Sequence, residues 1–192
     1  MHDIEPYFKW REKYIASEDK QSPFHGRAYS EFYFTNKIYN FVIHPQWDDF
    51  GSPTLYLKVL YVNYDLGVMM IELLGEWNDA INNDIMILRQ ELIDTAMDCG
   101  IKKFLFFCDN LLNFHGSDDA YYEDWFEHIE HGWICLLNTH DHVSDEMVDT
   151  RINYFVHLGE LFNGVFWQKY SPEQVLLMVE SQIKKHYNKE LI

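Results

Sequence analysis

Residues 103–108, KFLFFC, decide the fold of this chain. A short apolar run of this kind is typical of a strand buried on both faces, and it leads directly into Asp109 and Asn110. One similar run precedes it, VMMIELL at residues 68–74, and one follows it, GWICLL at residues 132–137. Segments of helical length separate the three runs. This alternation predicts a mostly parallel sheet with helices packed on it.

The N-terminal side follows a different pattern. Residues 54–62 predict a strand that turns back into residues 68–74, which is an antiparallel hairpin. Residues 4–17 have apolar positions at helical spacing and predict a helix, with Arg11 on its outer side. The fold class is therefore α/β, with a mixed, mostly parallel sheet, helices packed on it, and an antiparallel hairpin at the N-terminal side. Residues 1–192 are expected to form a single α/β domain.

Capping signals and apolar spacing predict the later helices. Residues 81–96 have an apolar stripe that repeats at helical spacing. Ser117 can cap a helix whose buried face includes Trp125. Ser171 and Gln174 form a capping-box pattern that starts a final helix. Each prediction depends on local sequence alone.

Charge is distributed unevenly along the chain. The formal net charge is -16 and the sequence pI is about 4.8. No Lys or Arg occurs between Phe104 and Thr150, a stretch rich in Asp, Glu and His. Carboxylates without a counter-charge suit a basic protein partner or a cation and repel phosphates. We therefore expect an acidic face over residues 109–149 and exclude nucleic acid and anionic membrane surfaces as partners.

Other features predict a cytoplasmic protein without a cofactor. The N-terminus lacks the apolar region of a signal peptide, and no apolar run approaches the about 18 residues of a membrane span. Cys99, Cys108 and Cys135 show no CxxC spacing, which argues against a disulfide framework or a zinc cluster. The sequence has no glycine-rich phosphate loop and no GxSxG nucleophile elbow.

Polar side chains follow the predicted strands. The first strand leads to Asp79, the second to Asp109 and Asn110, and the third to THDH at residues 139–142. Carboxyl ends of parallel strands share one edge of a sheet, where α/β proteins bind ligands. The same residue types also cap helices and make turns. The candidate ligand or partner site comprises Asp79, Asp109, Asn110, His115, Ser117, His140, Asp141 and His142.

The THDH motif allows two interpretations. On a strand, His140 and His142 would share a face and could bind one metal ion with a third ligand such as Asp109. Zinc requires three or four ligands in fixed geometry. In a loop, the two histidines would be ordinary turn residues. No metal ligand is therefore assigned.

The run GIKKFLFFCDNLLNFHGSDDAYYEDW resembles the centre of a STAS-type (anti-sigma-factor antagonist-like) domain. In that family an apolar strand ends in Asp, and an aromatic residue and a helix-starting Ser follow; here these are Asp109, Phe114 and Ser117. The resemblance covers about residues 55–149. The Asp-to-Ser spacing is one residue shorter than usual, and Gly116 stands where the family usually has Asp. The resemblance implies that Ser117 is a regulatory phosphorylation position, whereas capping chemistry alone makes it an N-cap.

Three hypotheses for function follow. The first is a non-enzymatic, STAS-like regulatory or protein-interaction module whose acidic face meets a protein partner with a basic surface. The alternative is a metal-dependent enzyme with an Asp/His site at the C-terminal ends of the strands. The third is a homo-oligomer whose surplus of aromatic residues forms the interface. An enzyme requires a concave pocket with convergent polar groups, and a module requires an exposed surface.

Overall fold

The computed structural model describes residues 4–30 and 32–190. Its main sheet has four strands in the order β3-β4-β5-β6. Strands β3 (Leu55–Asn63) and β4 (Val68–Asn78) form an antiparallel hairpin. Strands β5 (Lys103–His115) and β6 (Trp133–Leu137) continue the sheet in parallel. The predicted mixed, mostly parallel sheet with an N-terminal hairpin is confirmed.

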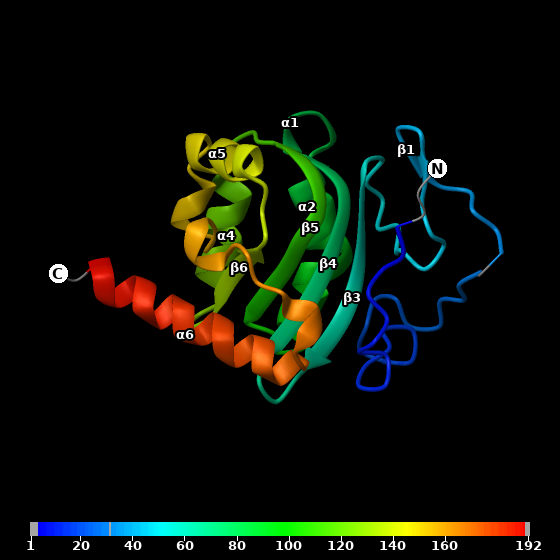
Figure 1. The fold of residues 1–192 in the computed structure, drawn as a ribbon, viewed down its shortest axis with the longest axis horizontal. Coiled ribbons are helices and arrows are strands. Elements are labelled where there is room, and N and C mark those ends of the chain that lie inside the picture. The colour runs from blue at the N-terminus through cyan, green and yellow to red at the C-terminus, as the bar shows by residue number, and fades with distance from the viewer. Residues whose placement is uncertain (1–3, 31, 191–192) are drawn as a thin grey trace.

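Helices and the N-terminal segment cover the two faces of this sheet (Figure 1). Helices α2 to α5 contribute to the core on one face, while α6 and Trp10 pack on the other. Among the helices in the described part of the chain, none is long and apolar enough to cross a membrane. The remaining bounds are β1 (Lys37–Ile38), β2 (Phe41–Val42), α1 (Asp79–Asn82), α2 (Asp84–Leu88), π-helix η1 (Arg89–Ile93), α3 (Asp94–Asp98), α4 (Ala120–His128), α5 (Asp141–Asp149), 3-10 helices η2 (Ile152–Tyr154), η3 (Glu160–Phe162) and η4 (Trp167–Lys169), and α6 (Pro172–Glu190).

Strand β5 is longer than predicted. The predicted strand ends at residue 108, but β5 continues to His115 because β4 also extends and pairs Asn78 with that residue. Strand β6 ends earlier, where Leu137 pairs with Phe107. Asp109 therefore lies in the middle of β5, just beyond the end of β6. The carboxyl edge of the sheet is stepped, which separates the polar residues that the sequence places at one edge.

The predicted helix over residues 4–17 is wrong. The segment forms consecutive turns, such as the hydrogen bond from the Lys13 N–H to the Trp10 carbonyl oxygen (2.9 Å). Trp10 and Tyr7 pack edge-on against Trp167, with ring centroids 5.4 and 4.9 Å apart. Burying these large rings on the sheet outweighs the weak preference of a short segment for a helix.

The two cap predictions have different outcomes. The capping box is confirmed, because the Ser171 N–H donates to Gln174 Oε1 (2.9 Å) and the Gln174 N–H donates to Ser171 Oγ (3.3 Å). Helix α4, however, begins at Ala120 and not directly after Ser117. The carboxylate of Asp118 accepts the Ala120 N–H (3.1 Å) and holds the turn before the helix.

Candidate functional site

The structure brings only part of the predicted site together. Asp109, His140 and Asp141 line one open pocket at the end of β6, which we call the strand-end pocket. Asp79 belongs to a buried network of its own, described below. His115 ends β5, where its Nε2 lies 3.0 Å from Asn113 Nδ2. Ser117 is exposed and lies before α4. Its phosphorylation stays a prediction of the resemblance.

Asp109 anchors the wall of the strand-end pocket. Asn138 turns the chain after β6 with a positive φ of 58° and donates from Nδ2 to Asp109 Oδ1 (3.0 Å). The indole N–H of Trp167 donates to Asp109 Oδ2 (2.8 Å). Asn138 also exchanges two hydrogen bonds with the backbone of Val165, at 2.8 and 2.9 Å. Both oxygens of Asp109 are thus occupied in tying the 163–168 loop to the sheet.

The strand interpretation of THDH is wrong. His140 is the N-cap residue of α5, and His142 lies in its first turn. Their exposed rings stack with centroids 5.7 Å apart, and His142 Nε2 lies 3.0 Å from the carbonyl oxygen of Leu112. Across residues 4–30 and 32–190, no three His, Cys, Asp or Glu side chains are grouped so that they could hold a metal ion. The metal-dependent alternative therefore receives no support from this geometry.

Asp79 has a structural role on the helix-covered face. Its Oδ1 accepts hydrogen bonds from Trp77 Nε1 (2.9 Å) and the Ile85 N–H (2.8 Å), and its Oδ2 accepts one from the Tyr122 hydroxyl (2.7 Å). Burial raises the pKa of Asp79 to about 6, although these donors oppose the shift. Asp79 therefore joins β4, α2 and α4 in the protein interior.

Glu72 is a buried acid that the sequence analysis missed. It is 5% exposed in β4, and its Oε2 accepts the Tyr7 N–H (2.8 Å) while Asn110 Nδ2 donates to Oε1 (3.4 Å). Burial raises the pKa of Glu72 to about 7, and the nearby charge of Asp109 adds to the shift. A lone acid inside the apolar run VMMIELL is the sequence signal that could have revealed it.

Replacing Glu72 with glutamine should stabilise the protein at pH 8. The folded pKa of about 7 lies above the ordinary value of 4.5, so the wild type loses stability as the pH rises between these values. Glutamine keeps an acceptor for the Tyr7 N–H without a charge. We expect a gain on the order of 1–3 kcal/mol at pH 8 and little change at pH 4, measured by urea unfolding across this range. An equal effect at both pH values would contradict the burial of a titrating carboxyl.

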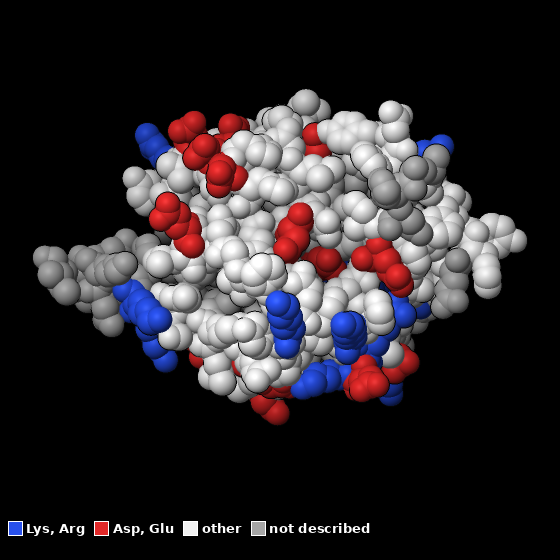
Figure 2. All heavy atoms as spheres, viewed as in Figure 1, with Lys and Arg blue, Asp and Glu red and all other residues white. Residues whose placement is uncertain are grey.

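A second hollow lies beside α5. It encloses about 620 Å³ between α5 and residues 153–163, and we call it the α5 groove. Three carboxylates line it, those of Asp141, Asp145 and Glu160, and its lining residues include no Lys or Arg. Tyr154, also in the lining, is 73% exposed. Figure 2 shows acidic side chains gathered over α5, while Lys and Arg lie mainly toward the lower side of the same view.

Comparisons with known proteins give a likeness of fold. No protein-family model matches the chain, and no curated protein matches it. Among solved structures, the fold is similar to that of the Bacillus cell fate determinant SpoIIAA in the phosphorylated form, with a TM-score of 0.40 and 12% identity over 64% of this chain and 98% of that one. A match at this level carries no function to this chain.

Proposed function

We propose that this protein is a non-enzymatic protein-interaction module whose α5 groove receives a basic segment of a protein partner. The observation that carries the proposal is the set of three carboxylates, from Asp141, Asp145 and Glu160, in a groove whose lining has no Lys or Arg. Complementary charge of this kind steers association and selects partners. The exposed ring of Tyr154 adds the aromatic contact that is enriched in interfaces.

The way in which Asp79, Asp109 and Glu72 are held supports a non-enzymatic role. Asp79 and Asp109 accept hydrogen bonds at both of their oxygens from groups of the protein itself. Glu72 lies under the backbone of Tyr7 and does not line the strand-end pocket or the α5 groove. Acids held in this way stabilise the fold. A catalytic acid, by contrast, would need to reach a bound substrate.

Ser117 offers a way to regulate this interaction. Its neighbour Gly116 donates from the backbone N–H to Glu146 Oε1 of α5 (3.3 Å), so Ser117 lies close to that helix. A phosphate on Ser117, as the STAS resemblance implies, would add negative charge near α5, the helix that carries Asp141 and Asp145. The added charge would strengthen binding of a basic segment.

The proposal is tested with a fluorescent dodecapeptide of alternating Arg and Gly. Neutralising the groove with Asp141→Asn, Asp145→Asn and Glu160→Gln should weaken binding about tenfold and reduce its salt dependence, because each exposed ion pair contributes about 0.5 kcal/mol. Fluorescence anisotropy at several salt concentrations measures both effects.

The matched control removes the same charge from α4 and its end. Glu123, Glu127 and Glu130 are exposed and do not line the groove. Changing all three to Gln should leave peptide affinity within about twofold of wild type, since a peptide in the groove would form no direct ion pair with these side chains. Equal weakening by both triple variants would show general attraction to an acidic protein, and absence of binding to the wild type would overturn the proposal.

A further inference from the structure

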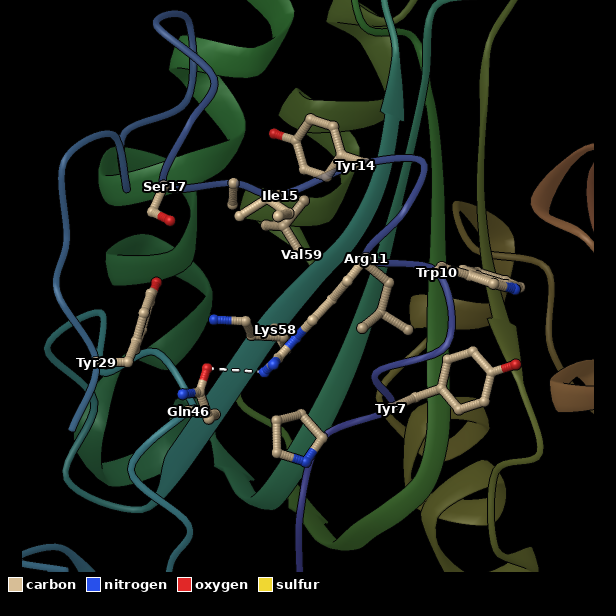
Figure 3. A pocket seen from close by; sticks show the side chains of 13 residues that line it. Tyr7, Trp10, Arg11, Tyr14, Ile15, Ser17, Tyr29, Gln46, Lys58 and Val59 are labelled. Carbon is tan, nitrogen blue, oxygen red and sulfur yellow. Dashed lines mark hydrogen bonds between the residues drawn. The ribbon is translucent and has the colours of Figure 1, made fainter. Parts of the chain in front are cut away.

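A separate cavity lies between the N-terminal segment and β3 (Figure 3). It has a volume of about 170 Å³. An apolar cavity of about 150 Å³ is large enough to bind benzene, so this one has room for a single ring. Aromatic side chains and aliphatic residues make most of its wall, including Tyr7, Trp10, Tyr14, Val59 and Leu60.

Two cations enter this mostly apolar cavity. In Figure 3, the side chains of Arg11 and Lys58 both extend toward the side where Tyr29 and Gln46 lie. Arg11 donates from Nη2 to Gln46 Oε1 (2.8 Å), which is a neutral acceptor. Among the described residues, no carboxylate lies within ion-pair distance of Arg11. Its guanidinium therefore keeps donors available for an anion.

The charge immediately around Lys58 is positive although the chain is acidic. Lys58 Nζ pairs with Asp48 Oδ2 (3.0 Å) and lies 3.8 Å from the centroid of the Tyr29 ring. Arg27 shares the same carboxylate, at 3.4 Å from Oδ1. Lys58 thus has two cations, Arg11 and Arg27, and one carboxylate, that of Asp48, in its surroundings. Burial is the main cause that lowers the pKa of Lys58, and repulsion from Arg11 and Arg27 lowers it further. The carboxylate of Asp48 raises this pKa and offsets only part of the shift.

We propose that this cavity binds a small organic carboxylate whose apolar part is about the size of one aromatic ring. The carboxylate would accept two hydrogen bonds from the guanidinium of Arg11, a geometry that lysine does not reproduce. The apolar part would lie against Tyr14, Val59 and Leu60. The volume excludes a nucleotide, and the cavity is distinct from the α5 groove in all its lining residues. The inference is therefore independent of the proposed function.

The test uses benzoate as the probe and benzamide as its neutral counterpart. Isothermal titration with the full chain should show one saturable benzoate site with a Kd on the order of 1 mM or tighter, and at least tenfold weaker binding of benzamide. Arg11→Gln should weaken benzoate at least tenfold. The benzoate affinity of Arg11→Lys should lie between those of the wild type and Arg11→Gln, because lysine keeps the charge and loses the paired donors.

A control on the same segment separates local contact from net charge. Lys9 is exposed and does not line the cavity, so Lys9→Gln should leave benzoate binding unchanged. The unfolding midpoint of each variant without ligand shows whether it folds as the wild type does. Failure of the wild type to bind benzoate, equal binding of benzamide, or unchanged binding by Arg11→Gln would each overturn the proposal.

Discussion

Replacing Trp125 with alanine should reduce the free energy of unfolding by about 3–5 kcal/mol. The side chain is fully buried on α4 and packs edge-on against Phe104 and Phe106 of β5, with centroids 5.0 and 6.0 Å apart. Alanine would leave a cavity between the helix and the sheet that these rigid rings cannot fill. Urea unfolding monitored by circular dichroism measures the loss.

Phenylalanine at position 125 is the matched control. The indole N–H of Trp125 has no hydrogen-bond partner among the described residues, so its removal forfeits no hydrogen bond. Trp125→Phe keeps most of the aromatic packing and should cost less than half as much as the alanine change. A Trp125→Ala midpoint close to that of the wild type would show that α4 does not pack on β5 as described.

Asp79→Ala should cost about 3–5 kcal/mol at pH 7. The change removes the acceptor for Trp77 Nε1, the Ile85 N–H and the Tyr122 hydroxyl together. Each buried donor left without a partner costs about 1–3 kcal/mol, and partial relaxation reduces the sum. The free energy of unfolding in urea measures the effect, and a loss below about 1 kcal/mol would contradict the buried network.

Asparagine separates the hydrogen bonds of Asp79 from its charge. Its Oδ1 can keep the bonds to Trp77 and Ile85, and the Tyr122 hydroxyl can accept from Nδ2. The folded pKa of Asp79, about 6, lies above its ordinary value of 3.8, so wild-type stability falls as the pH rises between these values. Asp79→Asn should therefore match the wild type at low pH, exceed its stability at pH 7 and lose this pH dependence. A loss as large as that of Asp79→Ala would show that the charge itself is needed.

Local sequence predicted the strands and helix caps that depend only on residues close together in the chain. The three apolar runs became β4, β5 and β6, because a continuous apolar segment is stable only when both sheet faces are covered. The Ser171–Gln174 capping box also formed, since all its partners lie within one turn.

The candidate site was predicted only in part. Asp109, His140 and Asp141 do line one pocket, because β5 and β6 are parallel neighbours and deliver them to one place. Asp79 belongs to another network, since β4 and β5 extend well past β6. The length of a strand depends on whether its neighbour continues to pair, and periodicity within one segment carries no information about that neighbour.

The amino-acid sequence by itself determined the three buried strands, the capping box of the final helix and the absence of Lys and Arg between positions 103 and 151. Only the tertiary structure decided where Arg11 and Glu72 lie. Residues 4–17 form turns in place of the predicted helix because packing Tyr7 and Trp10 on Trp167 stabilises the fold more than a short helix would. That packing brings the Tyr7 N–H to Glu72 and places Arg11 in the cavity beside Lys58. Contacts between residues this far apart in sequence depend on how whole elements fit together, and a local pattern does not contain that fit.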